Sequence, residues 1–174
     1  MGTIRDEIRQ TKPFESPADE AVVTLLATAD RVRTTLSAVT RAHDVTLQQY
    51  NVLRILRGAG PAGLPTLDIA ARMIEHSPGI TRLLGRLEAR GLVRRVRCPQ
   101  DRRQVLCHPT EKARRLLAAV DGPVAEAGRQ LLASLDTART AVLTGLLDAV
   151  RAAASSRIPG ANADHAESEK ERRI

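Results

Sequence analysis

A chain of 174 residues with 43% hydrophobic and 27% charged residues has the composition of a globular protein, not of a disordered one. One Phe, one Tyr and no Trp leave an aliphatic core, which suits packed helices and argues against recognition of single-stranded nucleic acid by base stacking. The net charge of +7 is localised, because residues 72–115 carry 12 Arg or Lys and four Asp or Glu, whereas the remaining residues carry 15 basic and 16 acidic groups.

This basic cluster is typical of a surface that binds a polyanion, although an ordinary solvated face is the plainer alternative. No apolar run reaches the roughly 18 residues that span a membrane, and the first residues do not resemble a secretory signal. Two cysteines make no disulfide framework. We therefore expect a cytoplasmic protein without a membrane segment.

The N-terminal part predicts an arm and a long helix. Residues 1–17 are expected to form a flexible arm. From about residue 18 to residue 43, apolar side chains three and four positions apart form a heptad stripe along one helix face. Such a helix needs an apolar partner, in this chain or in a second copy. The stripe consists of Val22, Leu25, Ala29, Val32, Leu36 and Val39.

Two shorter helices and a loop are predicted next. Thr46 and Gln49 form a capping-box pattern at the start of a helix that has Tyr50 on its buried stripe. Residues 58–65, GAGPAGLP, predict a loop. Thr66 is then expected to cap a short helix.

The following helix and hairpin carry most of the positive charge. Ser77 is predicted to be the N-cap, Pro78 the first helical residue and Gly91 the C-cap. Residues 92–98 and 104–108 predict two strands joined by a turn. Two helices with a tight connection and a basic hairpin form a winged helix-turn-helix, whose second helix enters the major groove while the wing lies along the backbone or the minor groove. The predicted fold class is mainly α with a small β-hairpin wing.

The outward face of this second helix and the hairpin supply the candidate DNA contacts. Arg82 and Arg86 are four residues apart and repel each other, a penalty that a polyanion facing both would remove. Gly85, unfavourable inside a helix, makes sense if DNA or a neighbouring helix approaches closely. Arg103 could alternatively be a solvated hairpin arginine. The predicted DNA-binding residues are Ser77, Pro78, Gly79, Thr81, Arg82, Arg86, Arg97, Asp101, Arg102 and Arg103.

The C-terminal part predicts helices and a tail. Thr110 starts a helix that residues 121–123, Asp-Gly-Pro, are expected to kink or break. Asp136 is expected to cap a last helix, and residues 155–174 are polar and expected to be disordered. The inner face of the last helix is predicted to hold Val142, Leu143, Leu146, Leu147 and Val150.

Residues 18–45 and 110–154 together hold more apolar surface than one small DNA-binding module can bury. We therefore expect these N- and C-terminal helices to form a dimerisation region around a DNA-binding domain at residues 46–109. The expected assembly is a homodimer that binds a palindromic operator in double-stranded DNA.

The segments SPGITRLLGRLEARGLVRR and DRRQVLCHPTEKARRLL resemble the multiple antibiotic resistance regulator (MarR) family. The family hallmark is an acidic residue, a basic residue two positions later and a Leu-Thr-x-x-Gly step into the next helix. These fall on Asp101, Arg103 and residues 109–113, where Pro replaces the Leu and Ala replaces the Gly. The departures affect the strand-to-helix joint and leave the wing tip intact.

The resemblance extends from about residue 18 to residue 154, most specifically over residues 66–117. It implies a homodimeric bacterial transcription regulator that small-molecule or oxidant signals release from DNA. We expect a repressor released by a small phenolic or other organic effector, and no enzyme. His43 and Tyr50 are candidate ligand-binding residues, although a helix-end cation and a core aromatic are the plainer interpretations.

Two alternatives stay open. Cys98 and Cys107 lie on opposite arms of the predicted hairpin and could make a thiol-based redox-responsive regulator of the same fold, although Cys107 could equally be an inward-facing strand residue. A sequence-tolerant architectural DNA-binding protein would share the basic surface. Catalytic, metal and cofactor sites are not expected, because no motif brings suitable ligands or a nucleophile and base together.

Overall fold

The computed structural model describes residues 2–75, 79–98, 101 and 104–157. The chain divides into two compact units, residues 1–130 and residues 131–174. Within the part of the chain that is described, no helix is long and apolar enough to cross a membrane.

The first unit begins with a short helix that the sequence pattern did not reveal. In α1, Ile4–Glu7, Thr3 and Asp6 form a capping box. Glu7 forms an ion pair with Arg31 of α2, Pro17–Arg41, which Ser16 caps. The predicted flexible arm therefore contains a capped helical turn that is tied to α2.

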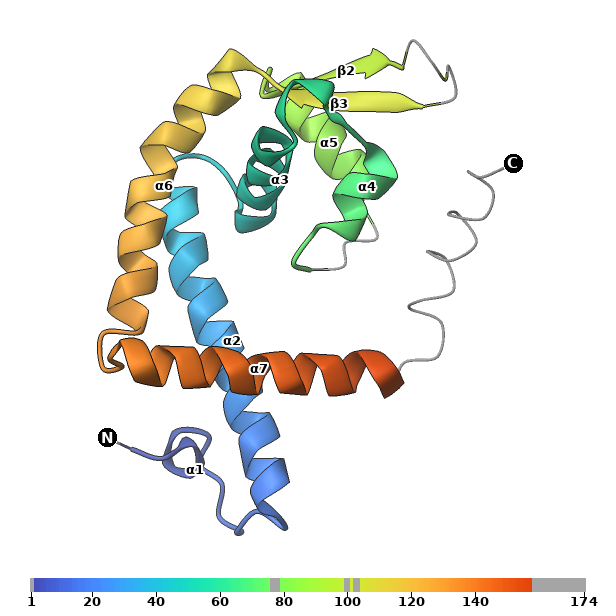
Figure 1. Cartoon of the computed structure of the whole chain (residues 1–174). Helices are drawn as coiled ribbons and strands as arrows, with labels where there is room; N and C mark the ends of the chain where they lie inside the picture. Colours follow the sequence, from blue (N-terminus) through green and yellow to red (C-terminus); the bar gives the residue numbers. More distant parts are fainter. Residues whose placement is uncertain (1, 76–78, 99–100, 102–103, 158–174) are drawn as a thin grey trace. The chain divides into compact units, whose positions relative to one another are not determined.

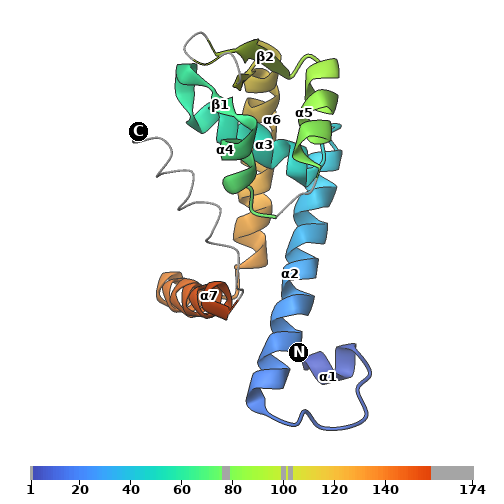
Figure 2. The same cartoon turned by 90° about the vertical axis from the view of Figure 1, so that its right-hand side faces the viewer.

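Helices α3, α4 and α5 lie close together at one end of the first unit, beside a small sheet (Figures 1 and 2). α3, Leu47–Gly58, begins at the predicted capping box of Thr46 and Gln49. α4, Thr66–Ala71, has Pro65 at its N-cap, so the prediction of Thr66 as the cap was wrong. The reason is that Pro65 is held extended by strand pairing, and the helix starts directly after it.

Helix α5, Ile80–Ala89, is the second helix of the predicted helix-turn-helix. Its N-cap position is Gly79, and the predicted cap Ser77 and its neighbour Pro78 lie outside the described residues. The predicted C-terminal glycine is confirmed, since Gly91 has φ +66° and the next amide, of Leu92, donates back to the Leu87 carbonyl at 2.9 Å.

Three antiparallel strands form a sheet in the order β1-β3-β2. β2, Val93–Arg97, and β3, Val105–Pro109, form the predicted hairpin. β1, Leu64–Pro65, lies inside the segment that was predicted to be a loop, and it pairs with β3. A two-residue strand has no periodic pattern, so the sequence could not show it. The backbone of Gly63, which has φ +71°, lies against the His108 ring. A Cβ at this position would come within 2.5 Å of that ring.

The core of the first unit is aliphatic, as the composition predicts. It joins α3, α4, α5, the sheet and α6, Glu111–Leu131, within one cluster of buried side chains. Its largest fully buried side chains are Leu53, Leu56, Ile69, Leu84, Leu87, Leu92 and Leu117. This core is complete within one chain and holds α5 and the hairpin in place.

Helix α6 runs through Pro123 as one element, so of the predicted kink or break at residues 121–123 the break was wrong, and the kink stays a prediction. Pro123 lacks an N–H for the helical ladder, which costs about 3 kcal/mol in a helix interior. The burial of Val120 and Ala127, which lie on either side of Pro123 in the helix, offsets that loss. Asp121 also accepts hydrogen bonds from Tyr50 Oη at 2.7 Å and from Arg57 Nη1 at 2.5 Å, which ties this turn to α3.

The second unit contains helix α7, Thr137–Arg157, which begins at the predicted cap, since Asp136 Oδ1 accepts the Arg139 amide at 2.8 Å. The helix extends three residues into the predicted tail, and residues 158–174 lie outside the described residues. Its predicted inner face is largely exposed: Val142 and Leu146 are each 62% exposed and Val150 is 52% exposed. The prediction that these side chains are buried was therefore wrong for a single chain.

Candidate nucleic-acid interface

Helix α5 has one buried face and one basic exposed face. Leu83, Leu84 and Leu87 are buried, whereas Arg82 and Arg86 are exposed. Neither arginine side chain forms an ion pair or hydrogen bond with another described residue. Both guanidinium groups are therefore available to an anionic partner. Of the other predicted contacts, Thr81 is exposed beside them and Gly79 lies at the start of the helix.

Gly85 lies on the same side of the helix, and the structure leaves open space there. A Cβ at Gly85 would meet no atom of the described residues within 4 Å, apart from the backbone of its own helix. Packing within the chain therefore does not require a glycine at this position. The predicted reason, close approach of DNA or of another helix, stays a prediction.

The hairpin continues the basic surface. Arg97 is exposed at the end of β2, opposite Val105 of β3. Asp101 is half-buried, and its carbonyl accepts the Gln104 amide at 2.9 Å, which closes the turn. The predicted contacts Arg102 and Arg103 lie outside the described residues, as do Ser77 and Pro78.

The joint between the wing and α6 is held by side chains that donate hydrogen bonds to backbone carbonyls. Thr110 Oγ1 donates to the Gly91 carbonyl at 2.8 Å, and Lys112 Nζ donates to the Arg90 carbonyl at 2.9 Å. Pro109 is the last residue of β3, and Ala113 is fully buried. The joint is therefore well formed with Pro and Ala at the two positions where the sequence departs from the family pattern.

An ion pair that the sequence analysis missed connects α5 to the wing. Arg95 Nε donates to Glu88 Oε2 at 2.7 Å, and Arg95 Nη2 bonds the same oxygen. This hydrogen bonding lowers the pKa of Glu88, although burial acts in the opposite direction. The two residues are seven apart, on either side of a turn, so no helical or strand spacing links them.

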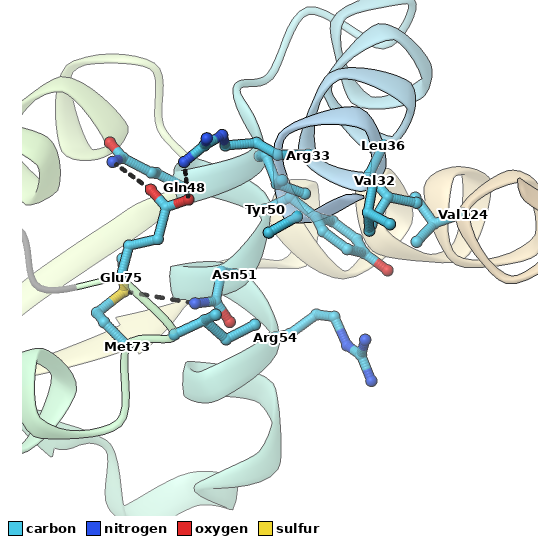
Figure 3. A pocket seen from close by; sticks show the side chains of 13 residues that line it. Val32, Arg33, Leu36, Gln48, Tyr50, Asn51, Arg54, Met73, Glu75 and Val124 are labelled. Atoms are coloured by element: carbon cyan, nitrogen blue, oxygen red, sulfur yellow. Dashed lines mark hydrogen bonds and ion pairs between the residues drawn. The ribbon is translucent and has the colours of Figure 1, made fainter. Parts of the chain in front are cut away.

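A cavity of about 400 Å³ lies among α2, α3, α6 and residues 73–75 (Figure 3). Tyr50 lines it and is only 4% exposed, so its predicted core role is confirmed, whereas ligand binding by Tyr50 stays a prediction. Burial, followed by the hydrogen bond to Asp121, raises the pKa of Tyr50 to about 12. His43 does not line the cavity. The apolar lining is Ala29, Val32, Leu36, Leu47, Tyr50, Met73, Ile74 and Val124.

Polar groups hold one wall of this cavity. Glu75 accepts a hydrogen bond from Gln48 Nε2 at 3.2 Å and forms an ion pair with Arg33 Nη1 at 3.5 Å, as Figure 3 shows. Both partners belong to other elements, α3 and α2, whereas Glu75 precedes Gly79, the start of α5, by four residues. Arg54, 5.8 Å above the Tyr50 ring centroid, lines the cavity as well.

Comparison with known proteins identifies the family. The sequence model of the MarR family matches residues 45–105. A crystal structure of a MarR transcription factor from Planctomyces limnophilus is 36% identical, has a TM-score of 0.61, and the match covers 78% of this chain and 98% of that one. The chain belongs to the MarR family.

Two further similar proteins have more specific names. The homoprotocatechuate degradative operon repressor of Escherichia coli is 29% identical over 147 residues, covering 83% of this chain and 98% of the repressor. CouR from Rhodococcus jostii RHA1, in a crystal structure with bound p-coumaroyl-CoA, is 25% identical with a TM-score of 0.67, covering 81% and 96% of the two chains. The winged helix-turn-helix prediction is confirmed, and this MarR-family protein is a transcription regulator and not an enzyme.

The two cysteines of this MarR-family chain do not face each other. Cys107 pairs with Arg95 across the hairpin, and the Cys98 amide donates to Gln104 O, so the two thiols are offset by three residues, roughly 10 Å along the strands. A disulfide within the hairpin therefore needs backbone movement. Cys107 is fully buried, which raises the pKa of its thiol despite a hydrogen bond to Thr66. The interpretation of Cys107 as an inward-facing strand residue is confirmed.

Proposed function

We propose that the protein is a homodimeric repressor that binds a palindromic operator in double-stranded DNA and that a small organic effector releases it. The observation that carries the DNA contact is the exposed pair Arg82 and Arg86, four residues apart on one face of α5 and without partners in the described chain. A helix of this kind presents a bidentate donor to guanine in the major groove. The name of the Escherichia coli relative supports the repressor role.

The hairpin extends this contact to the flanking DNA. Arg97, Arg102 and Arg103 would contact the backbone or minor groove next to the site of α5, while Asp101 would order the turn. The positive charges of α5 and the hairpin would then face two neighbouring grooves of the DNA. Ser77, Pro78, Gly79 and Thr81 complete the proposed contact of the α5 N-terminal end.

The effector would bind in the cavity between α2 and α3. Its volume and mostly apolar lining suit a small aromatic or aliphatic molecule, and Arg33, Gln48 and Asn51 offer polar contacts. The CouR structure with a bound aromatic thioester supports a ligand of this general kind. An occupant that takes the contacts of Arg33 or Gln48 would free Glu75, and with it the segment leading into α5. Differential affinity of this type is what couples a ligand to DNA release.

The DNA part of the proposal is tested by selecting duplexes that the wild-type protein retains from a random pool. A shared inverted repeat is expected. Recovery of unrelated sequences with equal affinity would instead indicate the architectural alternative.

The effector part is tested with a panel of phenolic acids, among them homoprotocatechuate, by loss of the protein from the selected duplex. Val32→Phe fills the cavity and should abolish the response while DNA binding persists. Val39→Phe is the matched control, because Val39 is a half-buried valine of the same helix outside the cavity. Equal responses of the two variants would place the effector elsewhere. Release by peroxide that Cys98→Ser and Cys107→Ser abolish would support the redox alternative.

A further inference from the structure

The contact between Glu88 and Arg95 joins the two elements that the proposed function places on DNA. Glu88 lies in the last turn of α5, on the flank between the buried leucines and the outward arginines. Arg95 lies in the middle of β2 and directs both Nε and Nη2 to one carboxylate oxygen. The side chains are 38% and 32% exposed, so the pair is neither buried nor loosely solvated.

The pair is not explained as a contact for phosphates. Glu88 is the only acidic residue of α5, and a carboxylate next to a DNA-binding face opposes the binding of a polyanion. Its charge is matched by Arg95, so the pair adds no net positive charge to the surface. A different contribution must account for a carboxylate at this position.

The way in which the hairpin is attached to α5 suggests a positioning role for the pair. The hairpin is attached to the end of α5 at the joint where Thr110 bonds the Gly91 carbonyl. Val93 and Cys107 also anchor the base of the hairpin in the core, whereas residues 94–97 of β2 are exposed. Arg95 attaches this exposed part of β2 to α5, two residues beyond Val93 and roughly 7 Å along the strand. The additional attachment restrains the direction of the exposed strand relative to the helix.

We propose that Glu88 and Arg95 form a brace that sets the angle between α5 and the wing, so that both reach their grooves in register. They are positioning residues, and they rest on the proposed DNA contacts of α5 and the hairpin. Loss of the brace should lower affinity for the operator more than affinity for DNA in general, because only specific binding requires both elements at fixed spacing.

The test compares the wild type with Glu88→Gln, using the duplex selected from the random pool and a scrambled duplex of the same composition. Glu88→Gln raises the net charge by one and should tighten binding of the scrambled duplex. Binding of the selected duplex should nevertheless weaken by roughly twofold to tenfold, the lower range of coupling between contacting side chains. The double variant Glu88→Arg, Arg95→Glu keeps the net charge and should restore specific affinity to within about twofold.

Thermal unfolding checks that each variant is folded, and Glu88→Asp serves as a second variant with the charge kept and the reach shortened. Tighter binding of both duplexes by Glu88→Gln, or no rescue by the folded double variant, would overturn the brace. Arg82→Ala separates this failure from a failure of the proposed interface. If Arg82→Ala weakens the selected duplex and Glu88→Gln does not, the interface stands and the brace fails. If neither Arg82→Ala nor Arg86→Ala has an effect, the interface itself is wrong.

Discussion

The winged helix-turn-helix region and the long terminal helices bury their apolar residues to very different extents. In the former, Leu53, Leu84 and Leu87 are fully buried within one chain. In the latter, Leu26 of α2 is 65% exposed and Leu146 of α7 is 62% exposed. Apolar stripes of this length are rarely left in water. The difference indicates that the DNA-binding region is held by its own core, and the exposed terminal helices are what the proposed dimer with a second copy of the chain requires.

The largest effect is expected from a charge placed in the exposed stripe of α7. Leu146→Glu should convert the proposed dimer to a monomer and remove specific DNA binding with it, because a carboxylate buried without a partner costs several kcal/mol. Sedimentation equilibrium at micromolar concentration measures the change. Leu67→Glu is the control, since Leu67 is a leucine that is 79% exposed on α4, outside both terminal helices. A wild-type protein that is already monomeric would contradict this side of the comparison.

A second substitution tests whether the DNA-binding region is held by its own core. Leu84→Ala removes a fully buried side chain from the core and should lower the free energy of unfolding by about 2–5 kcal/mol, through lost burial and the cavity left behind. Leu26→Ala should have a smaller effect, and one that depends on protein concentration, because it acts through the dimer. Urea unfolding at two concentrations distinguishes the two. A concentration-independent loss of equal size for Leu26→Ala would show that α2 packs within one chain.

Smaller and more specific effects are expected on the exposed face of α5. Arg82→Ala or Arg86→Ala should cost about 1–3 kcal/mol of binding at particular operator positions, because at least one of them reads a base edge. Affinities for operators substituted one base pair at a time measure this. If both variants weaken all sequences equally, the arginines contact phosphates only.

The smallest effects concern the turn of the wing. Arg103→Ala should weaken binding, most where A·T pairs flank the site, and reduce the log–log salt slope by about one unit. Asp101→Ala should also weaken binding although it removes a negative charge, because Asp101 is expected to pair with an arginine and order the turn. Titration at several salt concentrations measures both. Tighter binding by Asp101→Ala would show that the turn needs no ordering.

Local sequence signals were sufficient to predict most helices and strands of the DNA-binding region. The capping box of Thr46, the leucine spacing of α5, Gly91 and the hairpin were all predicted from short patterns, and the structure confirms them. Each of these features is determined by residues within a few positions of one another.

Features that depend on distant residues were missed. β1 exists only because β3 pairs with it, and α6 continues through Pro123 because of burial and the contacts of Asp121 with α3. The Glu88–Arg95 pair and the cavity likewise arise from elements that the fold brings together. The exposure of α7 was missed for a related reason, since an apolar stripe does not say whether its partner is in the same chain.

Footprinting on the DNA upstream of its own gene shows whether the protein binds DNA as a dimer through α5 and the wing. Two protected half-sites about one helical turn apart, centred on an inverted repeat, are expected. Arg82→Ala should lose this footprint at protein concentrations where the wild type still protects it. Uniform protection along the DNA, unchanged in Arg82→Ala, would contradict the account.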